Sequence, residues 1–332
     1  MHHFSTNVYS STDRNGKFKK YDAIIKTFPN SSLITEINYR ESDLAIIYSW
    51  TTENTNSVGE SPAKTNIKLY KRQIIDSQLK YSKHVMAIDN SLFVYRDQAY
   101  LYNYLRYSMD GVYANTGYYF DRDVDETRWE KIKKDLSIEV KPWRNTGDHV
   151  LLCLQRSNGF SFNYERGMLD WLTKTILDIT KVTDRKIIIR KHPGDGRLHN
   201  VVQKVIANFN NNNSKIPRNS KTTKNKIFAT SNTRIEDDLK NAWCCLVYNS
   251  SPSVVSTIEG VPVFLLDPNP KKSQAYHMSN TDLGLIETPN MPDNRQEWLE
   301  KLAMSHFSYE DVENGLLYNA AHKFFEEKNG RI

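Results

Sequence analysis

Two apolar runs, each ending in a polar turn, constrain the fold of this chain most strongly. The first is the strand-like segment 186–190, which leads into Lys191-His-Pro-Gly194, and the second is 243–248, which leads into Asn249-Ser-Ser-Pro252. Buried strands followed by polar turns are typical of parallel sheets, and ligands of such sheets bind beyond the carboxyl ends of the strands. We therefore expect an α/β protein with a binding site after these two strands.

Strands and helices alternate around these two runs. In the second half of the chain, the patterns predict strands at 149–155, 186–190, 227–230, 243–248 and 261–266 and helices at 164–179, 199–209, 235–242 and 254–259. In the first half they predict strands at 43–50 and 84–89 and helices at 68–80 and 121–136. Alternation at this interval predicts parallel sheets with helices on both faces.

The length of 332 residues is sufficient for two α/β domains. Pro and Gly punctuate 141–147, which indicates a linker there. We expect one domain at 1–145, a second at 146–290, and C-terminal helices at 291–332 that pack back on the body. No apolar run reaches the roughly 20 residues of a membrane span and no secretory signal opens the chain, so the expected location is cytoplasmic.

The candidate binding residues are those that directly follow the strands of the second half. They are polar and none is a carboxylate, which favours an anion as the ligand: Gln155, Arg156, Arg190, Lys191, His192, Asn249, Ser250 and Ser251. Pro193 holds the residue before it extended, and the Ser-Pro turn offers hydroxyls and N–H groups at a helix start. Ordinary helix capping explains these serines equally well.

Charge is concentrated in one window. Residues 181–226 hold twelve Lys or Arg against two Asp, a charge of +10 in a chain whose formal net charge is +6. Such an excess attracts phosphates of a nucleotide or of a nucleic acid, and the candidate nucleic-acid-binding residues are Lys215, Arg218, Lys221, Lys224 and Lys226. A solvated loop rich in Asn, Ser and Lys is the alternative.

Two other features have a functional and a structural interpretation. The tyrosine-dense stretch 95–120 could stack on a sugar or a base, or pack at a domain interface. Cys153, Cys244 and Cys245 all lie in apolar runs, so we expect buried thiols and neither a disulfide nor a metal site.

A set of short motifs carries a resemblance to a known family. His192-Pro193, Ser250-Ser251 and Glu259-Gly-Val-Pro-Val263 resemble the nucleotide-binding half of GT-B glycosyltransferases with paired HP and SS motifs. These include bacterial sialyl- and polysialyltransferases and the Kdo transferases of capsule synthesis. The resemblance spans roughly 149–268 and implies two Rossmann-like domains facing a central cleft. It further implies a UDP- or CMP-linked sugar donor, whose phosphate the His-Pro and Ser-Ser turns hold and whose ribose Glu259 faces. The other interpretation of Glu259 is a surface residue before a helix-capping glycine.

A second resemblance suggests the acceptor. The segments 141–144, 154–156, 190–193 and 293–299 are similar to a group of proteins common in tailed-phage genomes. In T-even-type phages, sugar transferases modify hydroxymethylated cytosines of the viral DNA, which implies double-stranded DNA as the acceptor in a host cytoplasm. Three alternatives stay open: a transferase building a capsule or cell-surface polysaccharide, a non-catalytic nucleic-acid-binding module, and an epimerase-like enzyme of the same fold.

Catalysis by such an enzyme depends on stabilising the departing nucleotide phosphate, to which His192 would contribute with its neighbouring cations. We expect neither a metal nor a cofactor beyond the nucleotide sugar. An inverting transfer also needs a base for the acceptor hydroxyl, and Asp89 and Asp110 are the candidates. A capping or surface Asp is the stronger interpretation of each, and a retaining transfer would need no such base.

Overall fold

The chain divides into two compact units. We describe a computed structural model that covers residues 3–13, 20–51, 62–94, 104–157, 159–210, 227–230 and 234–330. Unit 1 consists of Met1–Ser91, Asp97–Leu136 and Gln296–Ile332, and unit 2 consists of Leu92–Arg96 and Ser137–Arg295. Each unit is described by itself below.

Unit 1 contains a six-stranded sheet in the order β12-β5-β4-β3-β1-β2. Its strands are β1 (Thr6–Tyr9), β2 (Ser31–Ile34), β3 (Leu44–Tyr48), β4 (His84–Asn90), β5 (Tyr104–Met109) and β12 (His306–Ser308). The first four are parallel, β5 runs antiparallel to β4, and β12 runs antiparallel to β5. The buried apolar side chains of β1 and β3 explain why these strands lie inside the sheet.

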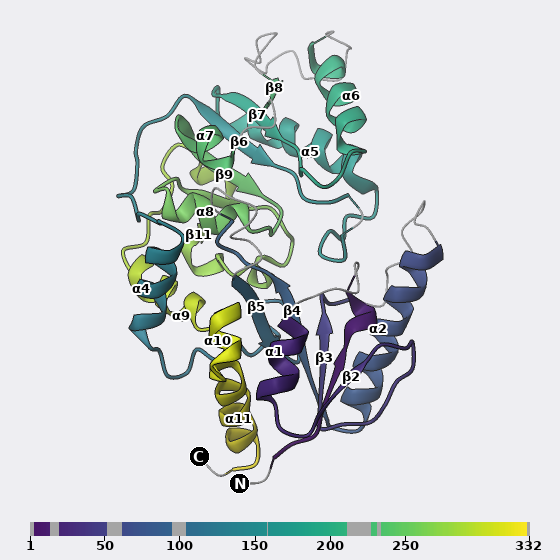
Figure 1. Cartoon of the computed structure of the whole chain (residues 1–332). Coiled ribbons are helices and arrows are strands. Elements are labelled where there is room, and N and C mark those ends of the chain that lie inside the picture. The colour runs from purple at the N-terminus through teal and green to yellow at the C-terminus, as the bar shows by residue number, and fades with distance from the viewer. Residues whose placement is uncertain are drawn as a thin grey trace. The chain divides into compact units, whose positions relative to one another are not determined.

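Helices cover both faces of this sheet. The helices of unit 1 are α1 (Lys20–Thr27), α2 (Pro62–Lys80), α4 (Glu126–Asp135), α9 (Arg295–Ala303), α10 (Tyr309–Glu313) and α11 (Leu316–Lys328), and η1 (Ser10–Thr12) is a short 3-10 turn. One core joins α1, α10 and α11 to one face, and Figure 1 shows these three helices together. A second core places Ile74 and Ile75 of α2 with Ala45 and Ile47 of β3 on the other face.

Unit 2 contains a second six-stranded sheet, in the order β11-β10-β9-β6-β7-β8, and all of its neighbouring strands are parallel. The strands are β6 (His149–Cys153), β7 (Lys186–Arg190), β8 (Ile227–Ala229), β9 (Ala242–Val247), β10 (Val263–Leu265) and β11 (Ser279–Asn280). The Val, Leu and Cys residues that dominate β6 and β9 are buried, as strands covered on both faces require.

The helices of unit 2 also lie on both faces. They are α5 (Gly167–Val182), α6 (Leu198–Asn210), α7 (Ile235–Leu239) and α8 (Pro252–Ile258), with 3-10 turns η2 (Pro270–Lys272), η3 (Tyr276–Met278) and η4 (Leu283–Leu285). The apolar stripe of α5, which includes Leu172, Ile176 and Ile179, packs with α6 on one face (Figure 1). On the other face α8 lies against β9 and β10. The predicted α/β class is confirmed.

The tyrosine-dense stretch is part of the core of unit 1. Residues 104–109 form β5, with every side chain buried, and Tyr107 is fully enclosed. A strand that is buried on both faces does not alternate between apolar and polar residues. Because β5 also contains Tyr and Arg, it is not a continuous apolar run either, and the sequence pattern does not predict a strand here. Tyr95, Tyr100 and Tyr102 lie outside the described residues.

The segment 141–144, expected to be a linker, is bound along its length within unit 2. The backbone N–H groups of Lys141 and Arg144 donate to the carbonyls of Ile258 and Gly260 at 2.9 and 2.8 Å. Gly260 adopts φ +72°, and a Cβ atom there would lie 2.0 Å from the carbonyl oxygen of Pro142. Only glycine permits this approach. The main segment of unit 2 thus runs from Ser137 to Arg295 and includes this stretch, which precedes the boundary near 145 that the sequence suggests.

Arg295 holds this segment in place. Its guanidinium donates to the carbonyls of Lys141 and Thr257 at 2.8 and 2.9 Å and lies 4.3 Å from the ring centre of Trp143. The indole N–H of Trp143 donates in turn to the carbonyl of Pro292 at 2.9 Å. We call Lys141–Arg144 with Arg295 the strap of unit 2.

Within the described ranges, no helix combines the length and the apolar character needed to cross a membrane. Within the same ranges, no three His, Cys, Asp or Glu side chains gather closely enough to hold a metal ion.

Candidate functional site

The three central strands of unit 2 end level with one another. Cys153, the last residue of β6, pairs with Arg190 of β7 on one side and with Val247 of β9 on the other. Neighbouring strands lie about 4.8 Å apart, so the turns after β7 and β9 begin about 10 Å apart, with the loop after β6 between them. The structure therefore brings Gln155, His192 and Ser250 to one edge of one sheet.

His192 is held by its own turn. The backbone N–H of Gly194 donates to Nδ1 of His192 at 3.0 Å. With Nδ1 accepting, the ring proton is on Nε2, which can donate to a ligand. Burial, and then the positive charge of Arg156, lowers the pKa of His192 below its ordinary value of 6.5. The imidazole is thus neutral at physiological pH and acts as a hydrogen-bond donor.

Arg156 lies against the His-Pro turn. A Cβ atom built on Gly194 would be 2.6 Å from Nη2 of Arg156 and 3.3 Å from its Cζ. The absence of a side chain at Gly194 is what lets the guanidinium approach the turn closely. Arg156 and His192, from the loops after two neighbouring strands, therefore place one full positive charge and one N–H donor side by side.

Asp195 joins these two loops. Asp195 is 6% exposed, and its carboxylate accepts hydrogen bonds from the N–H and the hydroxyl of Ser157 at 3.0 and 2.7 Å. It also accepts from Nε of Arg197 at 2.8 Å. These donors hold the pKa of Asp195 well below its usual range despite burial, which acts in the opposite direction. The hydrogen bonds between Asp195 and Ser157 thus fix the turn after β7 to the loop after β6.

The other two cations of the turn are directed elsewhere. Arg190 forms an ion pair with Asp238 of α7, and both side chains are largely buried. Nζ of Lys191 lies 3.4 Å from Nδ1 of His199 on α6. Arg190 therefore anchors β7 to α7, and Arg156 is the residue whose charge lies at the His-Pro turn.

The loop after β9 is held by a polar network. Nδ2 of Asn249 donates to the carbonyl of Ser161 at 3.1 Å and to the carboxylate of Asp267 at 2.5 Å. Nε2 of Gln155 donates to the hydroxyl of Ser161 at 3.2 Å. Ser161 thus connects the loops after β6 and β9, and Asn249 has a structural role in that connection.

Two buried polar atoms of this network have no hydrogen-bond partner among the described residues. They are Oε1 of Gln155 and Oγ of Ser250. Most buried polar atoms in proteins are hydrogen-bonded, so unpaired ones at a sheet edge indicate a place where a ligand or water supplies the partner.

The start of α8 offers fewer groups for binding an anion than the sequence suggests. The helix has seven residues, and Ser251 caps it without a side-chain hydrogen bond. Pro252, at the first position, has no N–H to offer. The candidate binding groups in this loop are therefore the serine hydroxyls rather than a helix N-terminus.

Glu259 does not join the other candidates. It lies at the opposite end of α8 from Ser251. The residue is 7% exposed, and its carboxylate forms an ion pair with Lys141 of the strap. The strap also contacts Leu239 and Lys240, which precede β9. Glu259 therefore lies at the amino edge of the sheet, away from His192 and Ser250.

The two candidate bases of unit 1 lie at opposite edges of its sheet. Asp89 is next to the carboxyl end of β4, and its carboxylate accepts from Nη2 of Arg106 at 2.9 Å. The carboxylate of Asp110 lies 2.7 Å from Nδ1 of His84 and accepts from the N–H of Val85 at 2.9 Å, at the start of β4. Of the two, Asp89 lies where ligands of parallel sheets bind.

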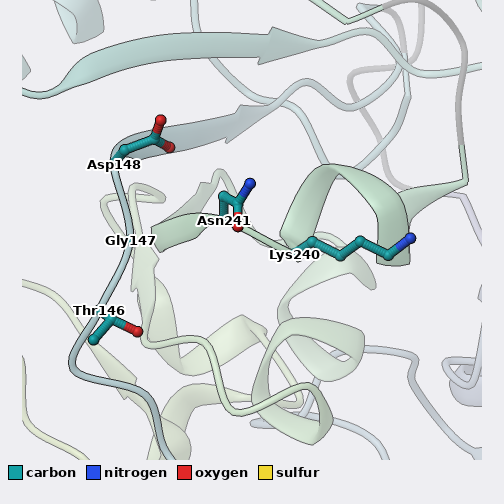
Figure 2. Close-up of a pocket in the computed structure, with 5 residues that line it drawn as sticks. All are labelled: Thr146, Gly147, Asp148, Lys240 and Asn241. Atoms are coloured by element: carbon teal, nitrogen blue, oxygen red, sulfur yellow. The ribbon is translucent and has the colours of Figure 1, made fainter.

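The pocket in Figure 2 is separate from these residues. It has a volume of about 360 Å³ and is lined by Thr146, Gly147 and Asp148, which precede β6, and by Lys240 and Asn241, which precede β9. In Figure 2 the Lys240 side chain extends away from Asp148. This pocket lies at the amino edge of the sheet, so it is not the predicted site.

Several residues at the carboxyl edges carry no signal in the sequence. Ser161, Asp195 and Asp267 support the binding loops, and Arg106 pairs with Asp89. Only the Asp of His192-Pro-Gly-Asp195 could have been noticed, because it follows the turn directly. The basic residues Lys215, Arg218, Lys221, Lys224 and Lys226 lie outside the described residues.

Comparison with known proteins shows the fold. No protein-family model matches this sequence, and no curated protein matches it. Among solved structures, the chain is similar to Thermosulfurimonas dismutans KpsC, beta Kdo 2,7 transferase, at 14% identity and a TM-score of 0.53, covering 95% of this chain and 99% of that one. It is also similar to Thermosulfurimonas dismutans KpsC, beta Kdo 2,4 transferase, at 11% identity and a TM-score of 0.54, covering 92% and 91%.

A third solved structure, Methanocaldococcus jannaschii UDP-GlcNAc 2-epimerase, matches at 14% identity over 82% of this chain and 86% of that one, but its TM-score of 0.35 is too low to carry an argument. The chain has the mixed α/β, GT-B-like architecture of two parallel-rich sheets that the first two structures share.

Proposed function

We propose that this chain is a glycosyltransferase that binds a nucleotide sugar at the carboxyl edge of the unit 2 sheet and extends a capsule or cell-surface polysaccharide. The observation that carries the proposal is the arrangement at this edge. Arg156, His192 and Ser250 come from the loops after three adjacent parallel strands, and together they offer a charge, an N–H donor and an unpaired hydroxyl.

The chemistry of these groups suits a departing nucleotide phosphate. When the bond between the sugar and the phosphate breaks, negative charge collects on the phosphate oxygens. A guanidinium and a neutral imidazole N–H that are already in position stabilise this charge without reorganising. The nucleotide sugar is then the only co-substrate that the proposal requires, linked through UDP or CMP.

The support for a polysaccharide acceptor differs from the support for a DNA acceptor. The likeness to two Kdo transferases supports a saccharide acceptor at the level of fold, and the HP and SS motifs are those of capsule-building transferases. The alternative, a hydroxymethylated cytosine in phage DNA, depends on Lys215 to Lys226, which lie outside the described residues. We therefore favour the polysaccharide acceptor over DNA.

In unit 1, Asp89 is the candidate to accept the proton of the acceptor hydroxyl. Its carboxylate is partly exposed, with 27% of the side chain accessible, and it forms an ion pair with Arg106 at 2.9 Å. An ionised carboxylate is what a general base requires.

A thermal-shift screen tests the donor proposal. Wild-type protein is heated with CMP, UMP, UDP and GDP and with their common sugar conjugates. A ligand at 100 times its dissociation constant adds about 2.7 kcal/mol of apparent stability, so one class should raise the melting temperature by several degrees. The proposal fails if none of these ligands shifts the melting temperature, or if the His192→Ala variant shows the same shift.

The acceptor is tested with the donor so identified. Transfer to a short polysaccharide fragment that is insensitive to salt between 50 and 200 mM supports the favoured acceptor. Transfer only to DNA, with activity falling steeply over this range, supports the phage alternative, because each phosphate contact releases a counterion. A protein that binds DNA but transfers from no donor is a non-catalytic binding module.

A further inference from the structure

Gln155 is a buried side chain in which one of the two polar atoms has no hydrogen-bond partner among the described residues. The residue is 5% exposed, and Nε2 of its carboxamide donates to the hydroxyl of Ser161 at 3.2 Å. Oε1 of the same carboxamide is fully enclosed and has no partner among the described residues. A buried carbonyl oxygen without a donor is costly, so a group from outside the chain is expected to donate to it.

The position of Gln155 relates this oxygen to the proposed donor site. Gln155 follows the central strand β6 by two residues, between the turn of His192 and the loop of Ser250. Its immediate neighbour Arg156 lies against the His-Pro turn. Any nucleotide whose phosphate lies at Arg156 and His192 therefore places another part of itself close to Gln155.

The surroundings of Gln155 are held firmly. Ser161, which binds its Nε2, is itself fixed through its carbonyl by Asn249, and Asn249 is fixed by Asp267. Next to these residues, Phe162 and Tyr248 pack with ring centres 5.0 Å apart. A carboxamide supported in this way keeps its oxygen in one place, as specific recognition requires.

The chemistry of the missing partner differs from that of a phosphate. A carbonyl oxygen only accepts hydrogen bonds, so it repels phosphate oxygens and binds N–H or O–H groups. We propose that Gln155 accepts a hydrogen bond from the nucleoside part of the donor, either an N–H of the base or a hydroxyl of the ribose. This inference rests on the proposed function, since it takes the phosphate to lie at Arg156 and His192.

Binding of four ligands to the full chain tests the inference: CMP, UMP, ribose 5-phosphate and inorganic phosphate, by titration calorimetry. The variant is Gln155→Met, which keeps the length and unbranched shape of the side chain and removes the oxygen. CMP or UMP, whichever binds the wild type, should bind the variant about tenfold more weakly, and inorganic phosphate should bind equally well. The matched control is Gln203→Met on the exposed side of α6, which should change nothing.

The ligand series separates the two sources of the donor group. If ribose 5-phosphate also weakens tenfold in Gln155→Met, a ribose hydroxyl is the partner; if only the nucleotides weaken, the base is. Unchanged affinities for all four ligands overturn the inference while leaving the donor site intact. If the wild type binds none of them and none of the nucleotides and nucleotide sugars of the thermal-shift screen, the proposed function itself is wrong.

A second variant decides the matter if Gln155→Met does not fold. Ser161→Ala removes the hydroxyl that holds Nε2 and leaves the apolar core untouched. The freed carboxamide should bind the nucleotide about threefold more weakly, with phosphate affinity unchanged. Equal nucleotide affinity in Ser161→Ala and wild type would then contradict a positioned Gln155.

Discussion

The backbone N–H of Gly194 donates a hydrogen bond to Nδ1 of His192 at 3.0 Å. This one contact assigns the ring proton to Nε2 and makes the imidazole a donor at the sheet edge. Because burial and Arg156 lower the pKa of His192, the ring contributes a hydrogen bond and Arg156 contributes the charge. The contribution of His192 to nucleotide affinity can be measured with a variant.

Replacing His192 by Ala should weaken nucleotide binding about tenfold, since one hydrogen bond to a charged phosphate is lost. His277→Ala is the control, because His277 is exposed in η3 of the same unit. Calorimetric titration of the nucleotide found in the thermal-shift screen gives both affinities. Equal losses in the two variants would mean that His192 has no specific role.

The Glu259→Gln variant should lower stability and leave nucleotide affinity unchanged. The substitution removes the charge that pairs with Lys141, at an expected cost of about 1–2 kcal/mol because Lys141 is half exposed. The free energy of unfolding and the nucleotide affinity are measured on the same sample. A loss of affinity without a loss of stability would restore the ribose-binding role implied by the family resemblance.

Gly260→Ala should destabilise unit 2 by several kcal/mol, because its Cβ atom would clash with the carbonyl of Pro142 at φ +72°. Gly167 is the matched control. It has φ +78° with nothing within 4 Å of its Cβ position, so Gly167→Ala should cost only about 1 kcal/mol of backbone strain. Urea unfolding measures the free energy of unfolding of both variants. Similar losses of stability would show that the strap can move away from the added methyl group at little cost.

His306 makes unit 1 sensitive to acid. Burial lowers its pKa from 6.5 to about 3, with Arg106 and Arg128 acting in the same direction and the hydrogen bond to Leu302 opposing them. The unfolded state therefore takes up a proton below pH 6.5 that the folded state takes up only near pH 3. Stability from the neutral ring is complete above pH 6.5 and falls by up to about 1.4 kcal/mol per pH unit below it.

Urea unfolding at pH 7.5 and pH 5.0 checks this expectation. The His306→Gln variant should be less stable than wild type at pH 7.5 but should lose about 2 kcal/mol less between the two pH values. His277→Ala should show the wild-type pH loss. An identical pH loss in all three proteins would show that other groups control the acid sensitivity.

The two acidic candidates of unit 1 should differ in their effect on turnover. If Asp89 is the base, Asp89→Asn lowers kcat by a factor of about 10² to 10⁴, with little change in donor affinity. Asp110→Asn removes a contact with His84 at the other edge and should change stability but not kcat. A normal kcat for Asp89→Asn would point to a retaining transfer or to another base.

The fold of unit 2 could be predicted because its strands obey simple rules. The apolar runs before Arg156, His192 and Asn249 are buried parallel strands, and such strands depend on local composition. Because the carboxyl ends of parallel strands lie at one edge of a sheet, Gln155, His192 and Ser250 could be expected at the same edge. The adjacency of β9, β6 and β7 comes from the structure.

What the sequence could not show depends on contacts between distant segments. Arg190 is polar and ends the strand β7, yet its partner Asp238, 48 residues away, pairs with its charge. Glu259 belongs to the same set of motifs as Ser250 and Ser251, but α8 lies between them, so Glu259 lies at the amino edge of the sheet. The strand β5 was missed because Tyr104 and Arg106 are buried by a β12 that comes some 200 residues later. Long-range pairing of this kind leaves no local pattern.

The strap has a practical consequence for dissecting the protein. A fragment spanning 146–290, the boundaries that composition suggests, would lack both Lys141–Arg144 and Arg295. The carbonyls of Leu239, Ile258 and Gly260 would then each lose a donor, and Trp143 would be absent from its place beside Pro292. A separately expressed unit 2 should therefore include Ser137 through Arg295 if it is to remain folded.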